Sequence, residues 1–256
     1  MRKRFVVNVT DCIDIAAIEL RASVLNALGN DASVVVEPYV PILPPFSKIN
    51  ANFAVRLTAD CYPSETVIFT TINAERIRPP NVIGRTKKKR IVFLGRNMGS
   101  FDWLTRDFGC EELYDLGKHY AAGSQFRSFE GKLTTAPLAA KAALGVSLVE
   151  LGDLISPTDI VRLDIPDGTI IHVDNFGMMK FTGQLEEPNE GASYRVSLRD
   201  RQIEAVFGKR LMSFETGTWV LFPGSSLNLY ELGKVRQLGA GELGAAVGDV
   251  LKFERI

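Results

Sequence analysis

The sequence is poor in histidine and cysteine. It contains two histidines, His119 and His172, and three cysteines, Cys12, Cys61 and Cys110. No two of them stand at metal-ligand spacing, and an odd number of distant cysteines does not make a disulfide framework. We therefore expect no metal site and a reducing, cytoplasmic compartment. Neither histidine has an obvious acid or nucleophile partner in the sequence, so a Ser-His-Asp triad has no support.

The sequence also lacks an excess of charge and any long apolar run. The 30 Lys and Arg residues balance the 30 Asp and Glu residues, which argues against a nucleic-acid-binding or membrane-surface protein. No run approaches the length of a membrane span, and the apolar run near the start breaks at Asn8 and Asp11, too early for a signal peptide. No P-loop is present, and no G-x-G-x-x-G follows a strand. A polar small-molecule ligand is compatible with this composition.

The first 155 residues alternate between β-type and helical patterns. Four short apolar runs predict strands: 4–10, 33–40, 66–73 and 90–97. Helical patterns occupy four further segments: 14–29, 47–62, 100–109 and 133–145. Asp14 and Ser47 are candidate N-caps, and Gly29 is a candidate stop. The apolar residues of the first helix recur at helical spacing: Ile15, Ile18, Ala22, Leu25 and Leu28. Strands that alternate with helices indicate parallel βαβ units.

After residue 155 the pattern changes to short β runs separated by turn signals, with no convincing long helix. These runs lie within 159–177, 192–203, 218–232 and 248–256. The sequence therefore predicts an α/β domain with a mainly parallel sheet over residues 1–155. A smaller all-β barrel or sandwich over 156–256 follows it. The basic stretch TKKKR (86–90) is interpreted as a solvated loop.

Asp11 stands where a predicted strand ends and a helix begins. Ligands of open α/β sheets bind outside the carboxyl ends of strands, so an acid at this point could hold a ribose diol. The alternative is that Asp11 or Asp14 caps the helix, which is the commoner role of Asp at such a position.

The segment HVDNFGMMKFTG (172–183) places an acid and a Phe-Gly step inside an apolar β pattern. In a binding site, Asp174 would face a cation, Phe176 would offer a flat apolar face to a base, and Gly177 would let the backbone approach the ligand. The alternative is that Asp174 and Gly177 build a bend, since glycine in a strand often marks a bulge.

The order of several motifs resembles the family of S-adenosyl-L-methionine (SAM) hydroxide adenosyltransferases. These SAM hydrolases are related to the SAM-dependent fluorinase and chlorinase. That family opens with a strand ending in Thr-Asp, like Thr10-Asp11 here, and its C-terminal domain carries Asp-x-Phe-Gly-Asn, which 174–178 matches in all but the last residue. Segments 226–233 and 248–253 are similar to its Ser-x-Gly-x-x-Glu-Ile-Ala and Gly-Asp-x-Val elements. The similarity is spread along the whole chain.

The resemblance implies a homotrimer in which the N-terminal domain of one subunit and the C-terminal domain of its neighbour share the substrate. It implies that Asp11 holds the ribose hydroxyls, Asp174 the methionine ammonium and Phe176 the adenine, with Ser226 near the methionine end. The implied reaction displaces methionine from C5′ of SAM by water and gives adenosine and methionine. SAM is then the substrate, and no further cofactor is implied.

The sequence departs from the family pattern mainly around the reacting water. In the family this water is surrounded by an Asp, an Arg and the His of Thr-Phe-His-Gly-Arg-Asp. Here Asn73 replaces the Asp, Arg76 or Arg78 supplies the Arg, and Glu130 replaces the His. Asn73 can orient a water, and Glu130 is a candidate general base. Met178 replaces the Asn that reads adenine.

These replacements leave two hypotheses. One is a divergent SAM hydrolase, with catalytic candidates Asn73, Arg76 and Glu130. The other is a non-catalytic relative that binds a nucleoside or SAM, or serves in assembly, and has lost the catalytic Asp and His.

Overall fold

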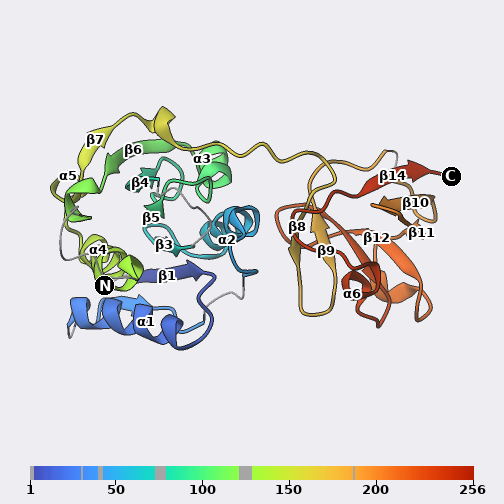
Figure 1. The fold of residues 1–256 in the computed structure, drawn as a ribbon, viewed down its shortest axis with the longest axis horizontal. Helices are drawn as coiled ribbons and strands as arrows, with labels where there is room; N and C mark the ends of the chain where they lie inside the picture. Colours follow the sequence, from blue (N-terminus) through green and yellow to red (C-terminus); the bar gives the residue numbers. More distant parts are fainter. Residues whose placement is uncertain (1–2, 30, 40–42, 73–78, 121–128, 187) are drawn as a thin grey trace. The chain divides into compact units, whose positions relative to one another are not determined.

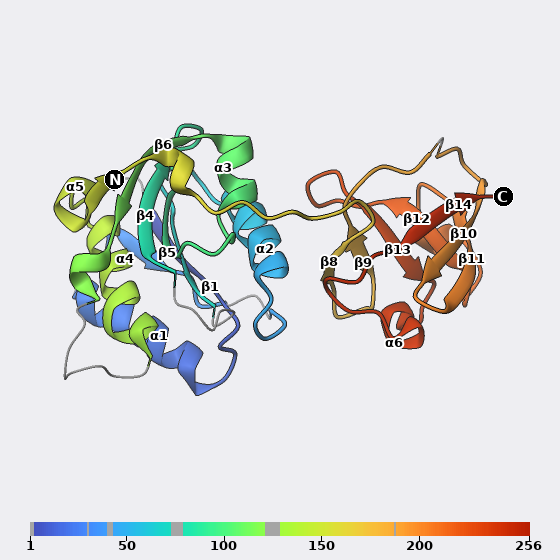
Figure 2. The same cartoon turned by 45° about the horizontal axis from the view of Figure 1, so that its top comes forward.

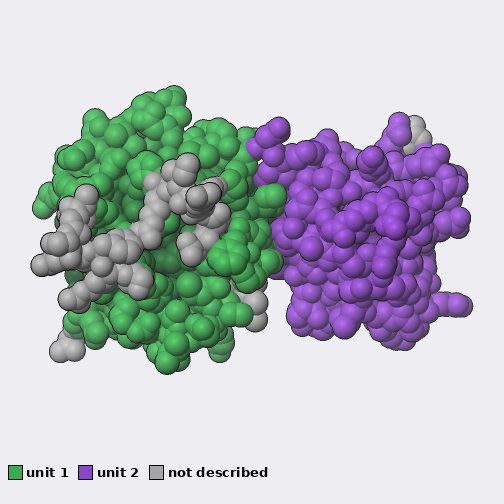
Figure 3. Space-filling model, viewed as in Figure 1, with its two compact units in different colours: residues 1–163 green, residues 164–256 purple. Residues whose placement is uncertain are grey.

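The structure, a computed structural model, divides into two compact units, residues 1–163 and 164–256 (Figure 3). It describes residues 3–29, 31–39, 43–72, 79–120, 129–186 and 188–256. The boundary expected at residue 155 coincides with the end of strand β7 (Asp153–Ile155), whereas the first unit continues to Leu163. Strand β7 pairs with β6 (Cys110–Asp115), and hydrogen bonds from Arg162 and Leu163 to Asp102 join the segment after β7 to the first unit.

The first unit is built on one seven-stranded sheet in the order β2-β1-β3-β5-β4-β6-β7. Its remaining strands are β1 (Arg4–Thr10), β2 (Val34–Val36), β3 (Val67–Thr71), β4 (Asn81–Thr86) and β5 (Val92–Arg96). Strands β2, β1, β3 and β5 run parallel, whereas β4, β6 and β7 are antiparallel to their neighbours. The sheet is therefore mixed, and the expectation of a mainly parallel sheet is corrected.

Helices cover both faces of this sheet (Figures 1 and 2). They are α1 (Ile15–Leu28), α2 (Lys48–Cys61), α3 (Asp102–Phe108), α4 (Ala136–Ala143) and α5 (Leu148–Leu151). Helices α1, α4 and α5 pack with one cluster of buried strand residues, and α2 and α3 with another. Successive residues of one strand enter opposite clusters, as Val92 and Phe93 do. This burial on both faces explains the unbroken apolar runs of the central strands.

Helix α1 begins and ends where the sequence indicates. The side chain of Asp14 accepts a hydrogen bond from the backbone N–H of Ala16, and Gly29 ends the helix with a φ of +61°. The buried stripe, however, is formed by Leu20, Val24 and Leu28. Ile15 and Ile18 are exposed, because α1 packs on α4 and the sheet through a different face from the one that its most apolar residues suggest.

Three strands of the first unit, β4, β6 and β7, are absent from the sequence-based prediction. β4 lies in PPNVIGR, where prolines and a glycine favour a loop. The TKKKR stretch joins β4 to β5 as a turn, and its Lys89 ammonium donates to the carbonyls of Ala59, Asp60 and Tyr62. Lys89 of this basic turn therefore satisfies carbonyl groups at the C-terminus of α2.

The second unit is a seven-stranded sheet in the order β14-β10-β11-β12-β13-β9-β8. Its strands are β8 (Ile170–Val173), β9 (Met179–Phe181), β10 (Ser193–Leu198), β11 (Arg201–Phe207), β12 (Trp219–Pro223), β13 (Tyr230–Lys234) and β14 (Lys252–Arg255). Backbone bonds from Ile170 to Asp249 and from Leu251 to Gly168 join the two ends of the sheet. The sheet thus closes around one apolar core.

The prediction of two domains, the first of them α/β, is confirmed, but the second domain is not purely β, contrary to the prediction. It contains helix α6 (Gly239–Leu243), and β11 pairs with β12 in parallel. The helix is too short to leave a helical period in the sequence. Among the described residues, no helix combines the length and apolar character needed to cross a membrane.

The carboxylate of Asp102 attaches the last segment of the first unit to α3. It is 2% exposed, and it accepts from Arg106 Nε at 2.7 Å, Arg162 Nη1 at 2.8 Å and the backbone N–H of Leu163 at 2.9 Å. We expect Asp102→Asn to lower the free energy of unfolding by about 1.5–3 kcal/mol, because an amide cannot accept all these bonds.

Urea unfolding measures this effect, with Trp103 as the fluorescent reporter of the first unit in a Trp219→Phe background. The control is Asp153→Asn, whose carboxylate is exposed and lies 3.7 Å from Lys118; we expect a change below about 0.5 kcal/mol. Equal effects of the two substitutions would contradict the role of Asp102.

Candidate functional site

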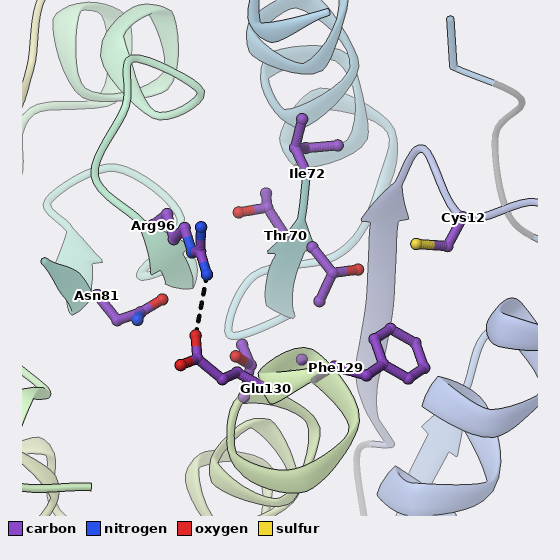
Figure 4. A pocket seen from close by; sticks show the side chains of 10 residues that line it. Cys12, Thr70, Ile72, Asn81, Arg96, Phe129 and Glu130 are labelled. Atoms are coloured by element: carbon purple, nitrogen blue, oxygen red, sulfur yellow. Dashed lines mark hydrogen bonds and ion pairs between the residues drawn. The ribbon is translucent and has the colours of Figure 1, made fainter. Parts of the chain in front are cut away.

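The first unit has a cavity of about 260 Å³ at the carboxyl ends of β1, β3 and β5 (Figure 4). The residues that line it are Cys12, Thr70, Thr71, Ile72, Asn81, Arg96, Phe129, Glu130, Gly131 and Thr135. In open α/β sheets this edge is where ligands bind, because each strand delivers its following residues there.

Two charged residues that line this cavity, Arg96 and Glu130, form an ion pair. Arg96 Nη2 donates to Glu130 Oε2 at 2.9 Å, and Figure 4 shows the two side chains pointing toward each other. Arg96 ends β5, and Glu130 precedes a π-helical turn, η2 (Gly131–Thr135). A Cβ at Gly131 would lie 2.5 Å from Thr71 Cγ2, so glycine lets this turn approach β3. Sequence and sheet topology together therefore bring Glu130 to the strand ends.

Three threonines, Thr70, Thr71 and Thr135, line the cavity, and the hydroxyl groups of Thr71 and Thr135 bond nearby hydroxyls. Thr71 Oγ1 donates to Thr10 Oγ1 at 2.7 Å, and Thr10 Oγ1 donates to the Thr71 carbonyl at 2.8 Å. Thr70 Oγ1 is buried and has no hydrogen-bond partner among the described residues. Thr135 Oγ1 bonds the Tyr120 hydroxyl at 2.8 Å, and burial raises the pKa of Tyr120 to about 12. These groups remain neutral and can orient a small polar group such as water.

Asp11 lies at the end of β1, but it does not line the cavity, whereas its neighbour Cys12 does. Its Oδ2 accepts from the backbone N–H of Phe46 at 2.8 Å, which ties the loop after β1 to the loop before α2. The helix cap is Asp14. Of the two earlier interpretations, capping therefore falls to Asp14, and Asp11 keeps one oxygen, Oδ1, with only a 3.9 Å contact to Cys12 Sγ among the described residues.

Two predicted catalytic residues, Asn73 and Arg76, lie outside the described residues, as does the alternative Arg78. They fall between β3 and β4, whose ends Thr71 and Asn81 line the cavity.

The second unit has its own cavity, of about 750 Å³. It is lined by Asp174, Phe176, Met178, Lys180, Leu211, Met212, Phe222, Pro223, Gly224, Ser225, Glu231, Arg236, Gln237 and Leu238. A mainly apolar lining with a few charged groups is typical of small-molecule sites. Two predicted ligand residues, Asp174 and Phe176, lie in this wall; Ser226 is not among the lining residues, although Ser225 is.

The acid in the Phe-Gly segment builds a turn and also lines the cavity. Asp174 Oδ1 accepts from the backbone N–H groups of Phe176 and Met178, both at 2.9 Å. Gly177 has a φ of +73°, and a Cβ there would lie 2.9 Å from the carbonyl carbon of Leu238. The bend interpretation thus explains the position of Asp174 Oδ1 and the presence of Gly177. Phe176 takes no part in these bonds through its side chain; the residue is 63% exposed and lines the cavity.

Two charged residues of this cavity that sequence analysis did not single out are Lys180 and Glu231. They form an ion pair in the second cavity, where they are 9% and 5% exposed. Burial and the charge of Lys180 lower the pKa of the neighbouring His172, so this imidazole is neutral at pH 7. No local motif marks the pair, because strand pairing joins residues 180 and 231.

The three cysteine thiols differ in their environments, and this difference allows a test of the reactivity of Cys12. Burial raises the pKa of Cys110 to about 11 and also raises the pKa of Cys12, while Cys61 is exposed. Because the thiolate is the reactive form, we expect N-ethylmaleimide at pH 8 to label Cys61 first, as followed by peptide mass spectrometry. The same labelling in urea should make the three rates similar. Faster labelling of Cys12 would show an activated thiol in the first cavity.

Comparisons with known proteins show the fold. No protein-family model matches the sequence, and no curated protein does. Among solved structures, an uncharacterized conserved protein from Thermotoga maritima matches with a TM-score of 0.80 and 18% identity, over 97% of this chain and 100% of that one. A conserved hypothetical protein from Thermus thermophilus matches with a TM-score of 0.74 and 20% identity, over 99% of this chain and 100% of that one. Both units of the chain therefore belong to one shared two-domain fold.

Proposed function

We propose that this protein binds SAM, or a related adenosyl compound, and displaces methionine at C5′ by water to give adenosine and methionine. The observation that carries the proposal is the Glu130–Arg96 pair in a cavity at the strand ends, beside the hydroxyls of Thr70 and Thr71. The ordered resemblance of the sequence to SAM hydrolases supports the choice of substrate.

In the proposed step the water oxygen forms a bond to C5′ as the C5′–S bond breaks. The electron pair of that bond passes to sulfur, so methionine leaves as a neutral thioether. Glu130 accepts the proton of the water, and Arg96 holds the carboxylate in place. The threonine hydroxyls orient the water in line with the breaking bond.

The resemblance assigns the rest of the substrate to Asp11, Asp174, Phe176 and Ser226. Asp11 Oδ1 would accept a ribose hydroxyl, and Asp174, with Oδ1 committed to its turn, would pair with the methionine ammonium through Oδ2. Phe176 would pack on the adenine, with Ser226 near the methionine end. We further propose a cytoplasmic homotrimer, since a closed ring suits a site shared between neighbouring subunits.

A second candidate is a protein that binds the nucleoside without turnover. It is favoured by the Arg96–Glu130 bond itself, which already occupies one carboxylate oxygen, Oε2. A binding protein would keep this pair intact when the ligand is present.

Incubation with SAM in ¹⁸O-labelled water, followed by chromatography and mass spectrometry, tests the proposal. We expect adenosine labelled at its 5′ oxygen and unlabelled methionine. Asp11→Ala and Asp174→Asn should each lower kcat/KM at least about tenfold, because each removes a charged hydrogen-bond partner. The Asn variant keeps an acceptor for the turn. Asp31→Ala, which removes an exposed carboxylate bonded to Ser33, should change nothing.

The outcomes separate the two candidates. No product, with a nucleoside released on denaturation, would establish the binding protein. No product and no ligand would overturn both.

A further inference from the structure

The floor of the second cavity is the ion pair between Lys180 and Glu231. These residues face each other across the antiparallel pair β9 and β13. Met179 and Leu232, which pair at the next position, enter the apolar core. Since side chains alternate along a strand, Lys180 and Glu231 lie on the opposite face of the sheet, under the cavity.

Two glycines border this floor. A Cβ at Gly224 would lie 2.2 Å from Glu231 Oε1, and one at Gly233 would lie 2.2 Å from Met178 Sδ. Larger residues at either position would displace the charged pair or the wall above it. The absence of side chains at these two positions lets Glu231 and Met178 take their places in the lining.

Packing alone does not explain a charged pair at this place. Two charges removed from water lose much of their hydration free energy, and well-packed apolar residues are often as stabilising. Among the described residues, Lys180 Nζ donates to Glu231, and this bond uses one of its three hydrogens. Glu231 Oε1 accepts that bond, which leaves Oε2 as a second acceptor. The floor therefore presents a donor beside an acceptor.

The walls around this floor suit a flat, mainly apolar group. Phe176, Met212 and Leu238 line the cavity and are 63%, 58% and 65% exposed. Phe222, the β12 partner of Glu231, also lines it. Aromatic and thioether side chains of this kind pack favourably on ring faces. A sugar or a phosphate would leave these walls without a matching surface.

We propose that Lys180 and Glu231 read the edge of a purine base bound in this cavity. The 6-amino group of adenine would donate to Glu231, and the adjacent ring nitrogen would accept from Lys180 Nζ. The pair would thus supply hydrogen bonds to the base edge that the thioether of Met178 cannot supply. The choice of adenine rests on the proposed function; the donor-acceptor pattern and the apolar side chains of the walls belong to the cavity itself.

Isothermal titration calorimetry on the full chain, with adenosine and with purine riboside as probes, tests the inference. Purine riboside has the same ring and ribose but no 6-amino group. We expect it to bind at least about tenfold more weakly than adenosine, because it leaves a charged acceptor without a donor. In the double variant Lys180→Met, Glu231→Leu, the two affinities should become equal.

A second double variant exchanges the two charged residues, so that a loss of binding need not come from a loss of folding. Lys180→Glu with Glu231→Lys keeps both charges and their cross-strand pairing but exchanges donor and acceptor, and we expect it to weaken adenosine binding by a similar factor. The matched control is the exposed cross-strand pair of the same unit, Arg195 and Glu254. The double variant Arg195→Met, Glu254→Gln should retain the parental ratio of affinities. Circular dichroism confirms the fold of each variant.

The outcomes are distinct from those of the activity assay. Hydrolysis of SAM with an unchanged affinity ratio in both pair variants would overturn this inference and leave the proposed function standing. Adenosine binding that depends on the pair, without turnover of SAM, would uphold the inference and refute the hydrolase. A parent protein that binds neither nucleoside would overturn the inference.

Discussion

The substitution Glu130→Gln is expected to lower the rate of adenosine release from SAM by about 100-fold or more. Glutamine has nearly the same size and can keep a hydrogen bond to Arg96, so the cavity wall should hold its shape. It cannot accept the proton of the attacking water. The measurement is single-turnover formation of adenosine, with SAM affinity determined separately by calorimetry.

The design separates chemistry from binding. SAM affinity should change by less than about threefold, since this carboxylate acts on the water and binds no part of the substrate. The control is Glu111→Gln, which removes the charge from another ion pair of the same unit, the exposed pair with Arg90. It should retain the parental rate. A Glu130→Gln protein with full activity would remove Glu130 from the mechanism and direct attention to the segment 73–78.

Local signals in the sequence predicted much of the first unit. Asp14 and Ser47 begin their helices as expected, because an N-cap needs only a short side chain and the N–H groups two or three residues ahead of it. The antiparallel strands β4, β6 and β7 were missed, because their local residues carry no clear β pattern and pairing with neighbours defines them.

In the candidate sites, too, local signals identify some residues, whereas others are defined only by pairing between distant segments. Glu130 was found because a motif drew attention to it, and the segment of Asp174 because an acid within an apolar run is unusual. That Asp174 both stabilises a turn and lines the cavity could not be predicted from the sequence, because the turn hydrogen bonds to its Oδ1 depend on backbone geometry. Lys180 and Glu231 lie 51 residues apart and meet only through strand register. Nothing in the sequence near either residue specifies that partner.

Lys180→Met is expected to lower the free energy of unfolding of the second unit by about 3–5 kcal/mol, because it leaves the carboxylate of Glu231 buried without its cation. Adding Glu231→Leu should recover most of this loss, since an apolar pair has no charge to hydrate. The two single substitutions and the double one form a thermodynamic cycle whose coupling energy measures the pair.

The chain offers a reporter for this measurement. It has two tryptophans, Trp103 in the first unit and Trp219 in the second. A Trp103→Phe background therefore lets urea unfolding of the second unit be followed alone. Lys252→Met, which removes an exposed lysine from β14, is the control and should cost less than about 0.5 kcal/mol. If Lys180→Met cost no more than this control, Glu231 would be reached by water, and the cavity floor would be an open surface instead of a buried pair.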